Sequence, residues 1–211
     1  MKDTENCLTR LGGKRLLIFD FDGTVADTSP LHAAAFGKVL APFGISLNYP
    51  SIAGLKTSDA LRHSLSSHGI ELDDRRIADL VTEKQQLVRR IIGESLQPLP
   101  GVEEFLRWAR SRYRLAMVTS GSQGTVALAL RALGYDSLFD PLICADDVKE
   151  AKPDPEGFLL ALRMTNMRLA DALIFEDSTA GVQAAQLAGI DCWDVREAPL
   201  GLTDEMLEMS A

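Results

Sequence analysis

Residues that could carry chemistry follow the short apolar runs of this sequence. The first run ends in Asp20-Phe21-Asp22-Gly23-Thr24, the second in Thr119-Ser120-Gly121, and a later one in Glu176-Asp177-Ser178. Lys152 stands between the last two, in the segment Lys152-Pro153-Asp154-Pro155. These segments combine carboxylates, hydroxyls and a cation, which are the groups needed to bind and transfer an anionic group.

The four carboxylates predict a metal site. Carboxylates gathered in one cleft repel one another unless a cation lies among them. Oxygen ligands suit a hard divalent ion such as Mg²⁺. The candidate metal ligands are Asp20, Asp22, Glu176 and Asp177. Together with the ammonium of Lys152, such an ion would neutralise a phosphate, and phosphoryl transfer depends mainly on neutralisation and positioning.

The spacing of Asp20 and Asp22 suggests a division of labour between them. Residues two apart in extended backbone lie on the same face of a strand. One carboxylate can attack phosphorus as a nucleophile. The other can act first as a general acid and then as a general base.

Each of these segments also has a purely structural interpretation. Lys152 could be an ordinary solvated lysine. Thr119-Ser120 could cap a helix that begins near Gln123, and Glu176-Asp177 could cap a helix that begins at Thr179. The occurrence of all the segments in one chain, on strand ends, favours a shared site.

The apolar runs predict the strands of a parallel sheet. Continuous apolar runs of this length suit strands that are buried on both faces. They cover 16–19, 115–118, 142–144, 172–175 and, more weakly, 192–195. Helical patterns lie between them, at 102–112, 123–133, 156–164 and 179–188. This alternation predicts an α/β fold with a doubly wound, Rossmann-like parallel sheet, in which ligands bind outside the carboxyl ends of the strands.

The alternation is interrupted by a helical insert. Helical patterns at 30–43, 58–68 and 73–92 follow one another without a clear strand. The predicted domains are an α/β core, 1–28 with 98–211, and an α-helical cap at 29–97. The crossings at 26–30 and 93–100 would act as hinges.

The composition excludes several classes of protein. The 211 residues include 22 Lys and Arg against 30 Asp and Glu, a net charge of −8, which disfavours nucleic acid as a partner. Every apolar run is shorter than the ~20 residues that cross a bilayer, so no membrane contact is expected. Cys7, Cys144 and Cys192 are odd in number and form no Cys-x-x-Cys pair. Such thiols are typical of a cytoplasmic protein.

The order of these motifs resembles the haloacid dehalogenase superfamily, in its Mg²⁺-dependent phosphatase branch. The matching residues are Asp20-x-Asp22-Gly23-Thr24, Thr119, Lys152-Pro153 and Glu176-Asp177. The likeness extends roughly from Lys14 to Val195, and the insert stands at the position of that superfamily's small helical cap. The resemblance implies an enzyme that uses Mg²⁺ as its cofactor.

The resemblance assigns a role to each core motif. Asp20 matches the nucleophile that forms an aspartyl-phosphate, and Asp22 matches the acid/base, whose backbone carbonyl also binds the metal. Asp177 matches the metal-binding acid, with Glu176 as a further direct or water-mediated ligand. The groups that would hold the transferring phosphate are Thr119 and Lys152, with Ser120 and Gly121 beside them.

The insert carries the residues that would select the substrate, because the core chemistry is shared within the superfamily. Asp27-Thr28 followed by His32 resembles the subgroup that contains β-phosphoglucomutase and several sugar-phosphate phosphatases. The candidate substrate-binding residues of the insert are Thr28, His32, Gly54, Lys56, Thr57 and Lys84. A surface-helix interpretation stays open for His32 and Lys84. Thr57 stands where the mutase has an arginine that grips a second phosphate, which disfavours mutase activity.

The predicted function is the Mg²⁺-dependent hydrolysis of a small phosphorylated metabolite, a sugar phosphate such as fructose-1-phosphate. A β-phosphoglucomutase-type isomerase and a phosphoglycolate phosphatase are the enzymatic alternatives. A non-catalytic binding module is an alternative of another class, and the presence of Asp20, Asp22, Lys152 and Asp177 argues against it. We expect a monomer whose partner is the small metabolite.

Overall fold

The computed structural model describes residues 7–52, 55–203, 206 and 208. This part of the chain divides into two compact units: Asp27–Leu96 and the described residues on either side of that segment. Gly54, one of the residues expected to bind substrate, lies outside the described residues. None of the helices within the described ranges is both long and apolar enough to span a membrane.

A five-stranded parallel sheet forms the centre of the larger unit. Its strands are β1 (Leu16–Phe19), β2 (Arg114–Val118), β3 (Leu142–Ile143), β4 (Ala172–Glu176) and β5 (Asp191–Asp194). Their order across the sheet is β3-β2-β1-β4-β5, and each neighbouring pair is parallel. This order reverses at β1, as in a doubly wound sheet, so the predicted fold class is confirmed.

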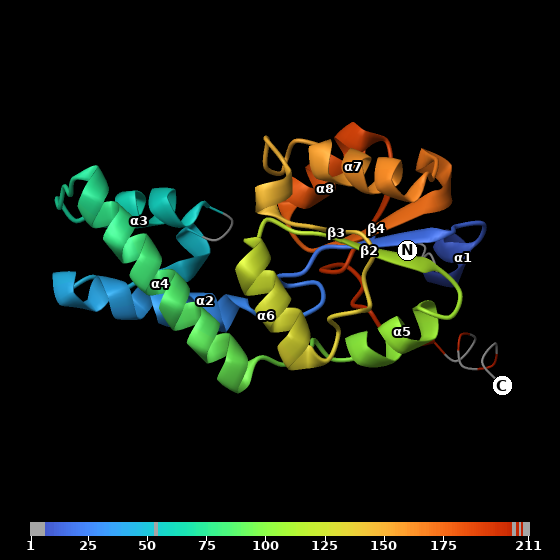
Figure 1. The fold of residues 1–211 in the computed structure, drawn as a ribbon, viewed down its shortest axis with the longest axis horizontal. Coiled ribbons are helices and arrows are strands. Elements are labelled where there is room, and N and C mark those ends of the chain that lie inside the picture. Colours follow the sequence, from blue (N-terminus) through green and yellow to red (C-terminus); the bar gives the residue numbers. More distant parts are fainter. Residues whose placement is uncertain (1–6, 53–54, 204–205, 207, 209–211) are drawn as a thin grey trace. The chain divides into compact units, whose positions relative to one another are not determined.

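Helices cover both faces of this sheet (Figure 1). They are α5 (Val102–Ala109), α6 (Gln123–Leu133), α7 (Glu156–Thr165) and α8 (Thr179–Ala188). On one face, α7 and α8 pack against Leu16 and Ile18 of β1. On the other face the rings of Phe19 and Phe175 stack with centroids 4.8 Å apart, and Phe105 of α5 meets both rings edge-on. β1 and β4 therefore contribute side chains to a core on each face of the sheet, which explains why the runs 16–19 and 172–175 are apolar throughout.

Most expected elements lie within a few residues of their predicted positions. The helices expected at 123–133 and 179–188 have the same bounds as α6 and α8, because Gly134 and Gly189 end them with left-handed φ angles of 74° and 70°. The last strand covers 191–194 rather than 192–195, and the helix expected at 102–112 ends at Ala109. A short helix, α1 (Cys7–Leu11), has no counterpart among the expected elements.

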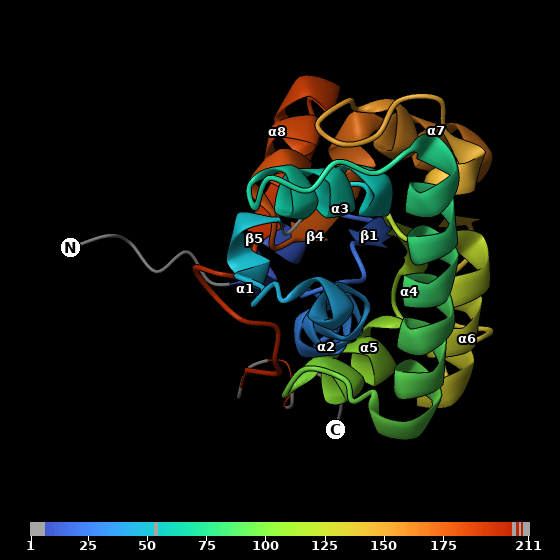
Figure 2. The ribbon, with the colours of Figure 1, turned by 90° about the vertical axis from the view of Figure 1, so that its left-hand side faces the viewer.

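The smaller unit is helical (Figure 2), and its buried side chains form a core of their own. It contains α2 (Ser29–Leu40), α3 (Thr57–Ser66) and α4 (Asp74–Ser95), with short 3-10 turns at Ala41–Phe43 and Tyr49–Ser51. Both α2 and α3 pack against the long α4. The buried positions of α4 are 77, 80, 84, 88 and 92, the spacing of a helix with one buried face. Because α4 continues through Gly93 to Ser95, the connection expected at 93–100 is shorter than predicted.

The two chain segments that connect the units pair with each other inside the larger unit. Ala26 forms an antiparallel bridge with Pro98, and the N–H of Leu99 donates to the carbonyl of Val25 at 3.0 Å. The entry and exit of the insert are therefore adjacent. This arrangement lets a long insert separate β1 and β2 in sequence while the two strands remain neighbours in the sheet.

Replacing Phe105 with alanine should lower the free energy of unfolding by about 3–5 kcal/mol, because its buried ring contacts Phe19 and Phe175. Denaturant unfolding followed by circular dichroism measures the loss. Met164 is 56% exposed on α7, so the control Met164→Ala should change the stability by less than about 0.5 kcal/mol. Equal losses in the two variants would contradict the place of Phe105 in the core.

Candidate active site

The parallel register brings the ends of three strands to the same level. Phe19 pairs with Met117 of β2 and with Phe175 of β4. The residue after Phe19 is Asp20, whose N–H donates to the carbonyl of Phe175 at 3.0 Å. Asp20 therefore lies between the residues that end β2 and β4, at the edge of the sheet where ligands bind in this fold class.

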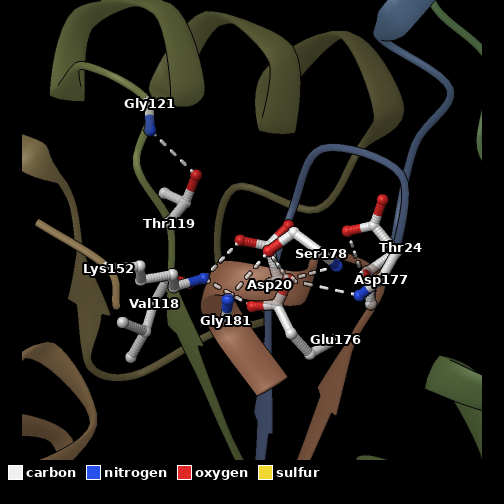
Figure 3. Close-up of polar contacts among 10 residues, drawn as sticks. All are labelled: Asp20, Thr24, Val118, Thr119, Gly121, Lys152, Glu176, Asp177, Ser178 and Gly181. Atoms are coloured by element: carbon white, nitrogen blue, oxygen red, sulfur yellow. Dashed lines mark hydrogen bonds and ion pairs between the residues drawn. The ribbon is translucent and has the colours of Figure 1, made fainter. Parts of the chain in front are cut away.

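The side chain of Lys152 reaches this edge from a loop (Figure 3). Its Nζ donates to Asp20 Oδ1 at 2.6 Å, to Glu176 Oε2 at 2.7 Å and to the carbonyl of Val118 at 3.0 Å. All three N–H groups of the ammonium are used in this way. The side chain is only 9% exposed, and Nζ lies 5.2 Å from the ring centroid of Phe158. The interpretation of Lys152 as a solvated lysine is therefore wrong.

Opposite charges keep Lys152 protonated in this buried position. Burial alone would lower its pKa, but the carboxylates of Asp20 and Glu176, and the hydrogen bonds to them, raise the pKa above its ordinary value. The pKa of Asp20 is also raised well above its ordinary value, by burial first and by the charge of Glu176 second, while Lys152 opposes both effects. Two carboxylates thus share one cation, and the site keeps an excess of negative charge.

Glu176 is fully buried, and hydrogen bonds satisfy both of its carboxylate oxygens. Oε1 accepts from the hydroxyl of Ser178 at 2.8 Å and from the backbone N–H groups of Ser178 and Asp177 at 3.0 and 3.2 Å. Oε2 accepts from Lys152. The carboxylate therefore holds both the lysine and the turn between β4 and α8.

Asp177 lies in the same turn and is half-buried. Burial, and next the charge of Glu176, raise the pKa of Asp177 to about 6. The hydroxyl of Thr24 donates to its Oδ1 at 3.4 Å. Gly23, with a φ angle of 86°, allows the close approach, because a Cβ there would lie 2.1 Å from Asp177 Oδ2.

Asp20, Glu176 and Asp177 form a set whose chemistry fits a divalent cation. One carboxylate oxygen of each residue lies within 4.8 Å of the other two. All are hard oxygen donors of the kind that Mg²⁺ takes in proteins. The raised pKa values of Asp20 and Asp177 reflect burial first and the negative charge of Glu176 second, and a cation would offset both effects.

The remaining core residues of the predicted site lie around this set. The charge of Asp22 raises the pKa of two neighbouring carboxyl groups, although its own carboxylate is not part of the set of three. Asp22 Oδ2 lies 3.8 Å from the point where a Cβ of Gly121 would stand. Thr119 is buried, and its Oγ1 accepts from the N–H of Gly121 at 3.0 Å, whereas Ser120 is exposed. The fold thus brings the core residues to one edge, and their catalytic roles stay predictions.

The family model of the haloacid dehalogenase-like hydrolases matches residues 17–195 of the chain. The chain belongs to the haloacid dehalogenase-like hydrolases. The matched range contains all of the core residues described above, and the resemblance expected from the motifs is confirmed.

Named relatives of this hydrolase cover most of its length. It is 36% identical over 181 residues to fructose-1-phosphate phosphatase YqaB of Escherichia coli (strain K12), which is 85% of this chain and 95% of that protein. It is 34% identical over 179 residues to a phosphorylated carbohydrates phosphatase of Thermotoga maritima, which is 83% of this chain and 82% of that one. The crystal structure of CbbY from Rhodobacter sphaeroides in complex with phosphate matches with a TM-score of 0.75 at 28% identity, covering 85% of this chain and 84% of that one.

The first turns of α6 and α8 are not capped by the motif residues that the structural interpretation assigned to them. The N-cap of α8 is Ser178, whose side chain accepts from the N–H of Gly181 at 2.9 Å, so the two preceding carboxylates do not cap this helix. At the start of α6 the N–H of Gln123 donates to Asp146 at 2.7 Å rather than to Thr119-Ser120. A backbone N–H is satisfied in both places without the residues of the predicted site.

Three neighbours of the site were not among the predicted site residues: Thr24, Ser178 and the carbonyl of Val118. Thr24 and Ser178 stand inside the quoted motifs, each close in sequence to a carboxylate. A hydroxyl beside a buried carboxylate is a natural hydrogen-bond donor, so a signal for both residues was present. A backbone carbonyl such as that of Val118 carries no signal in the sequence.

The predicted substrate-binding residues of the insert include one interacting pair. Lys84 is buried, and its Nζ lies 3.0 Å from Nδ1 of the half-buried His32. The surface-helix interpretation of Lys84 is therefore wrong. Thr28 is buried at the N-cap position of α2, Lys56 is exposed, and Thr57 is the first residue of α3.

Without divalent cations, Asp177 should make the protein less stable as the pH rises from about 4 to about 6. Its folded-state pKa of about 6 lies above the ordinary value of 3.8, so in this range the folded state holds a proton that the unfolded state has lost. Because the carboxyl group is partly exposed, solvent screening reduces the effect to about 1–2 kcal/mol.

The variant Asp177→Asn lacks this contribution, and urea unfolding of both proteins in a chelating buffer measures it. The free energy of unfolding of the wild type, relative to the variant, should fall between about pH 4 and about pH 6. A difference that stays constant over this range would contradict the raised pKa of Asp177.

Proposed function

We propose that this chain is a Mg²⁺-dependent phosphatase that hydrolyses the phosphoric monoester of a small sugar phosphate. The observation that carries the proposal is the buried contact of Asp20 with Lys152, beside the oxygens of Glu176 and Asp177. A carboxylate nucleophile, a cation and a set of hard oxygen ligands suit attack on phosphorus. The family and the phosphatases among the relatives support hydrolysis of a phosphoric monoester.

The reaction takes two steps on Asp20. In the first step an oxygen of Asp20 attacks phosphorus, and the bond between phosphorus and the ester oxygen of the sugar breaks. Asp22 gives a proton to that oxygen, so the sugar leaves as an alcohol. In the second step Asp22 takes a proton from water, the hydroxide attacks the phosphorus of the aspartyl-phosphate, and the bond to Asp20 breaks. Inorganic phosphate leaves, and both carboxyl groups return to their starting states.

The groups around Asp20 prepare this attack. Lys152 holds one oxygen of Asp20 at 2.6 Å and thereby orients the carboxylate. Since both oxygens of Glu176 already accept hydrogen bonds, Asp20, Asp177 and the backbone carbonyl of Asp22 are the groups that would hold Mg²⁺ directly. The ion, when bound, neutralises negative charge so that two anions can approach each other.

Thr119 and Lys152 are the side chains that would hold the transferring phosphate. Thr119 Oγ1 accepts from the N–H of Gly121, so the hydrogen of the same hydroxyl can donate to a phosphate oxygen. Lys152 contributes its charge, and Ser120, next to Thr119, is exposed. The N–H of Gly121 orients the threonine rather than contacting the phosphate itself.

A sugar phosphate is the substrate class that the relatives and the insert favour. One relative is named for fructose-1-phosphate and another for phosphorylated carbohydrates, and we propose the same class here. Lys84 and His32 place a polar pair on the buried, otherwise apolar face of α4. A lysine ammonium and an imidazole N–H can both donate to the hydroxyl and phosphate oxygens of such a substrate.

Asp20→Asn should lower kcat for a phosphate ester by about 1,000-fold or more, because the amide cannot form the aspartyl-phosphate. The matched control is Asp136→Asn, which makes the same charge change at an exposed position and should keep kcat. Chelation should abolish the wild-type activity, and added Mg²⁺ should restore it. A wild-type rate from the Asp20 variant would rule out Asp20 as the nucleophile.

Lys84→Met should raise KM for a phosphosugar by about tenfold, since methionine fills the buried space but donates no hydrogen bond. The control Lys38→Met, exposed on α2, should leave KM unchanged. Phosphate release from fructose-1-phosphate, β-glucose-1-phosphate and phosphoglycolate measures both effects, with the highest kcat/KM expected for a phosphosugar. Glucose-6-phosphate formed without phosphate release would assign an isomerase instead, and a preference for phosphoglycolate would overturn the sugar-phosphate assignment.

A further inference from the structure

Gly181 lies in the first turn of α8, directly against the carboxylate of Glu176 (Figure 3). A Cβ at this position would lie 2.0 Å from Cδ and Oε2 of Glu176 and 2.5 Å from its Cγ. Oε2 is the oxygen that accepts from Lys152 at 2.7 Å. The space that a side chain at position 181 would need is therefore filled by the carboxylate that holds the lysine.

The helix itself gives no reason for a glycine at this position. Glycine in a helix is less favourable than alanine, because it loses more backbone freedom on folding. The N–H of Gly181 donates to Ser178 Oγ at 2.9 Å, and that hydroxyl donates to Glu176 Oε1 at 2.8 Å. The start of α8 thus restricts the position of the Glu176 carboxylate in two ways. This chain of hydrogen bonds holds it, and the absence of a Cβ at Gly181 leaves the space that it occupies.

We propose that Gly181 is a positioning residue of the hydrolytic reaction, which reserves the space in which Glu176 holds Lys152 beside Asp20. The proposal rests on the proposed function and adds to it a residue that contacts neither the substrate nor the metal. A methyl group at 181 would force the fully buried Glu176 away from its place. Lys152 would then lose one of its three acceptors, and a buried carboxylate would lose its cation.

Gly181→Ala tests the proposal against a matched control, Gly93→Ala. Gly93 also lies inside a helix, but nothing lies within 4 Å of the position that its Cβ would take. Both substitutions improve helix propensity. Gly93→Ala should keep kcat and leave Tm unchanged or raise it by up to about 4 °C, whereas Gly181→Ala should lower kcat by about 100-fold and also lower Tm.

A Glu176→Ala background separates positioning from general damage to α8. The three atoms nearest to a Cβ at 181 all belong to Glu176, so removing that side chain removes these close contacts. We therefore expect Gly181→Ala to lower Tm in the wild type but not in the Glu176→Ala protein. An equal fall in Tm in both backgrounds, or an unchanged kcat in the single variant, would overturn the proposal.

A crystal structure of the Gly181→Ala protein decides the question where Glu176→Ala does not fold. Glu176 Oε2 should then lie more than about 3.5 Å from Lys152 Nζ, beyond hydrogen-bond distance, and an unmoved carboxylate would overturn the proposal. Failure of the proposed function has a different signature: the wild type would release no phosphate from any ester. The Tm comparison needs no substrate, so it tests the position of Gly181 independently.

Discussion

The contact of Lys152 with Asp20 and Glu176 is the interaction on which the site of this hydrolase depends. Burying three charged groups costs free energy unless they neutralise and hydrogen-bond one another. Here one ammonium serves two carboxylates and the carbonyl of Val118, so each of its hydrogens has an acceptor. These groups come from β1, β2, β4 and a loop, and they meet only when the sheet has its parallel register. Fold and site are therefore stabilised by the same contacts.

Acidic side chains stabilise the loop that carries Lys152. Glu156, at the start of α7, accepts with one carboxylate oxygen from the backbone N–H groups of Lys149 and Glu150, both at 3.0 Å. Asp154 accepts from the N–H of Glu156 at 2.9 Å. These carboxylates accept hydrogen bonds from backbone N–H groups that, in a strand or helix, would donate to backbone carbonyls. The loop thus has a defined path without regular secondary structure, and the lysine arrives at a defined place.

The sheet, the helices and the meeting of the core motifs at one edge could be predicted because local patterns determine them. Strands buried on both faces are apolar throughout, and motifs at parallel strand ends must meet at one edge. The acceptors of Lys152 could not be predicted, because they depend on the path of an irregular loop. The role of Gly181 could not be predicted either, because it depends on how closely α8 approaches Glu176. The spacing of residues in the sequence does not indicate that distance. The burial of Lys84 did have a signal, since it continues the apolar stripe of α4.

Location of a bound Mn²⁺ by anomalous diffraction tests most directly the claim that this charge cluster is a divalent-cation site for phosphoryl transfer. We expect one ion per chain, bound by carboxylate oxygens of Asp20 and Asp177, with Lys152 still hydrogen-bonded to Glu176. Burial, and next the negative charge of Glu176, raise the pKa of Asp177 to about 6, and such an ion would neutralise the negative charge of the cluster. An ion bound elsewhere, no ion at this edge of the sheet, or Lys152 displaced from Glu176 by the metal would contradict the account.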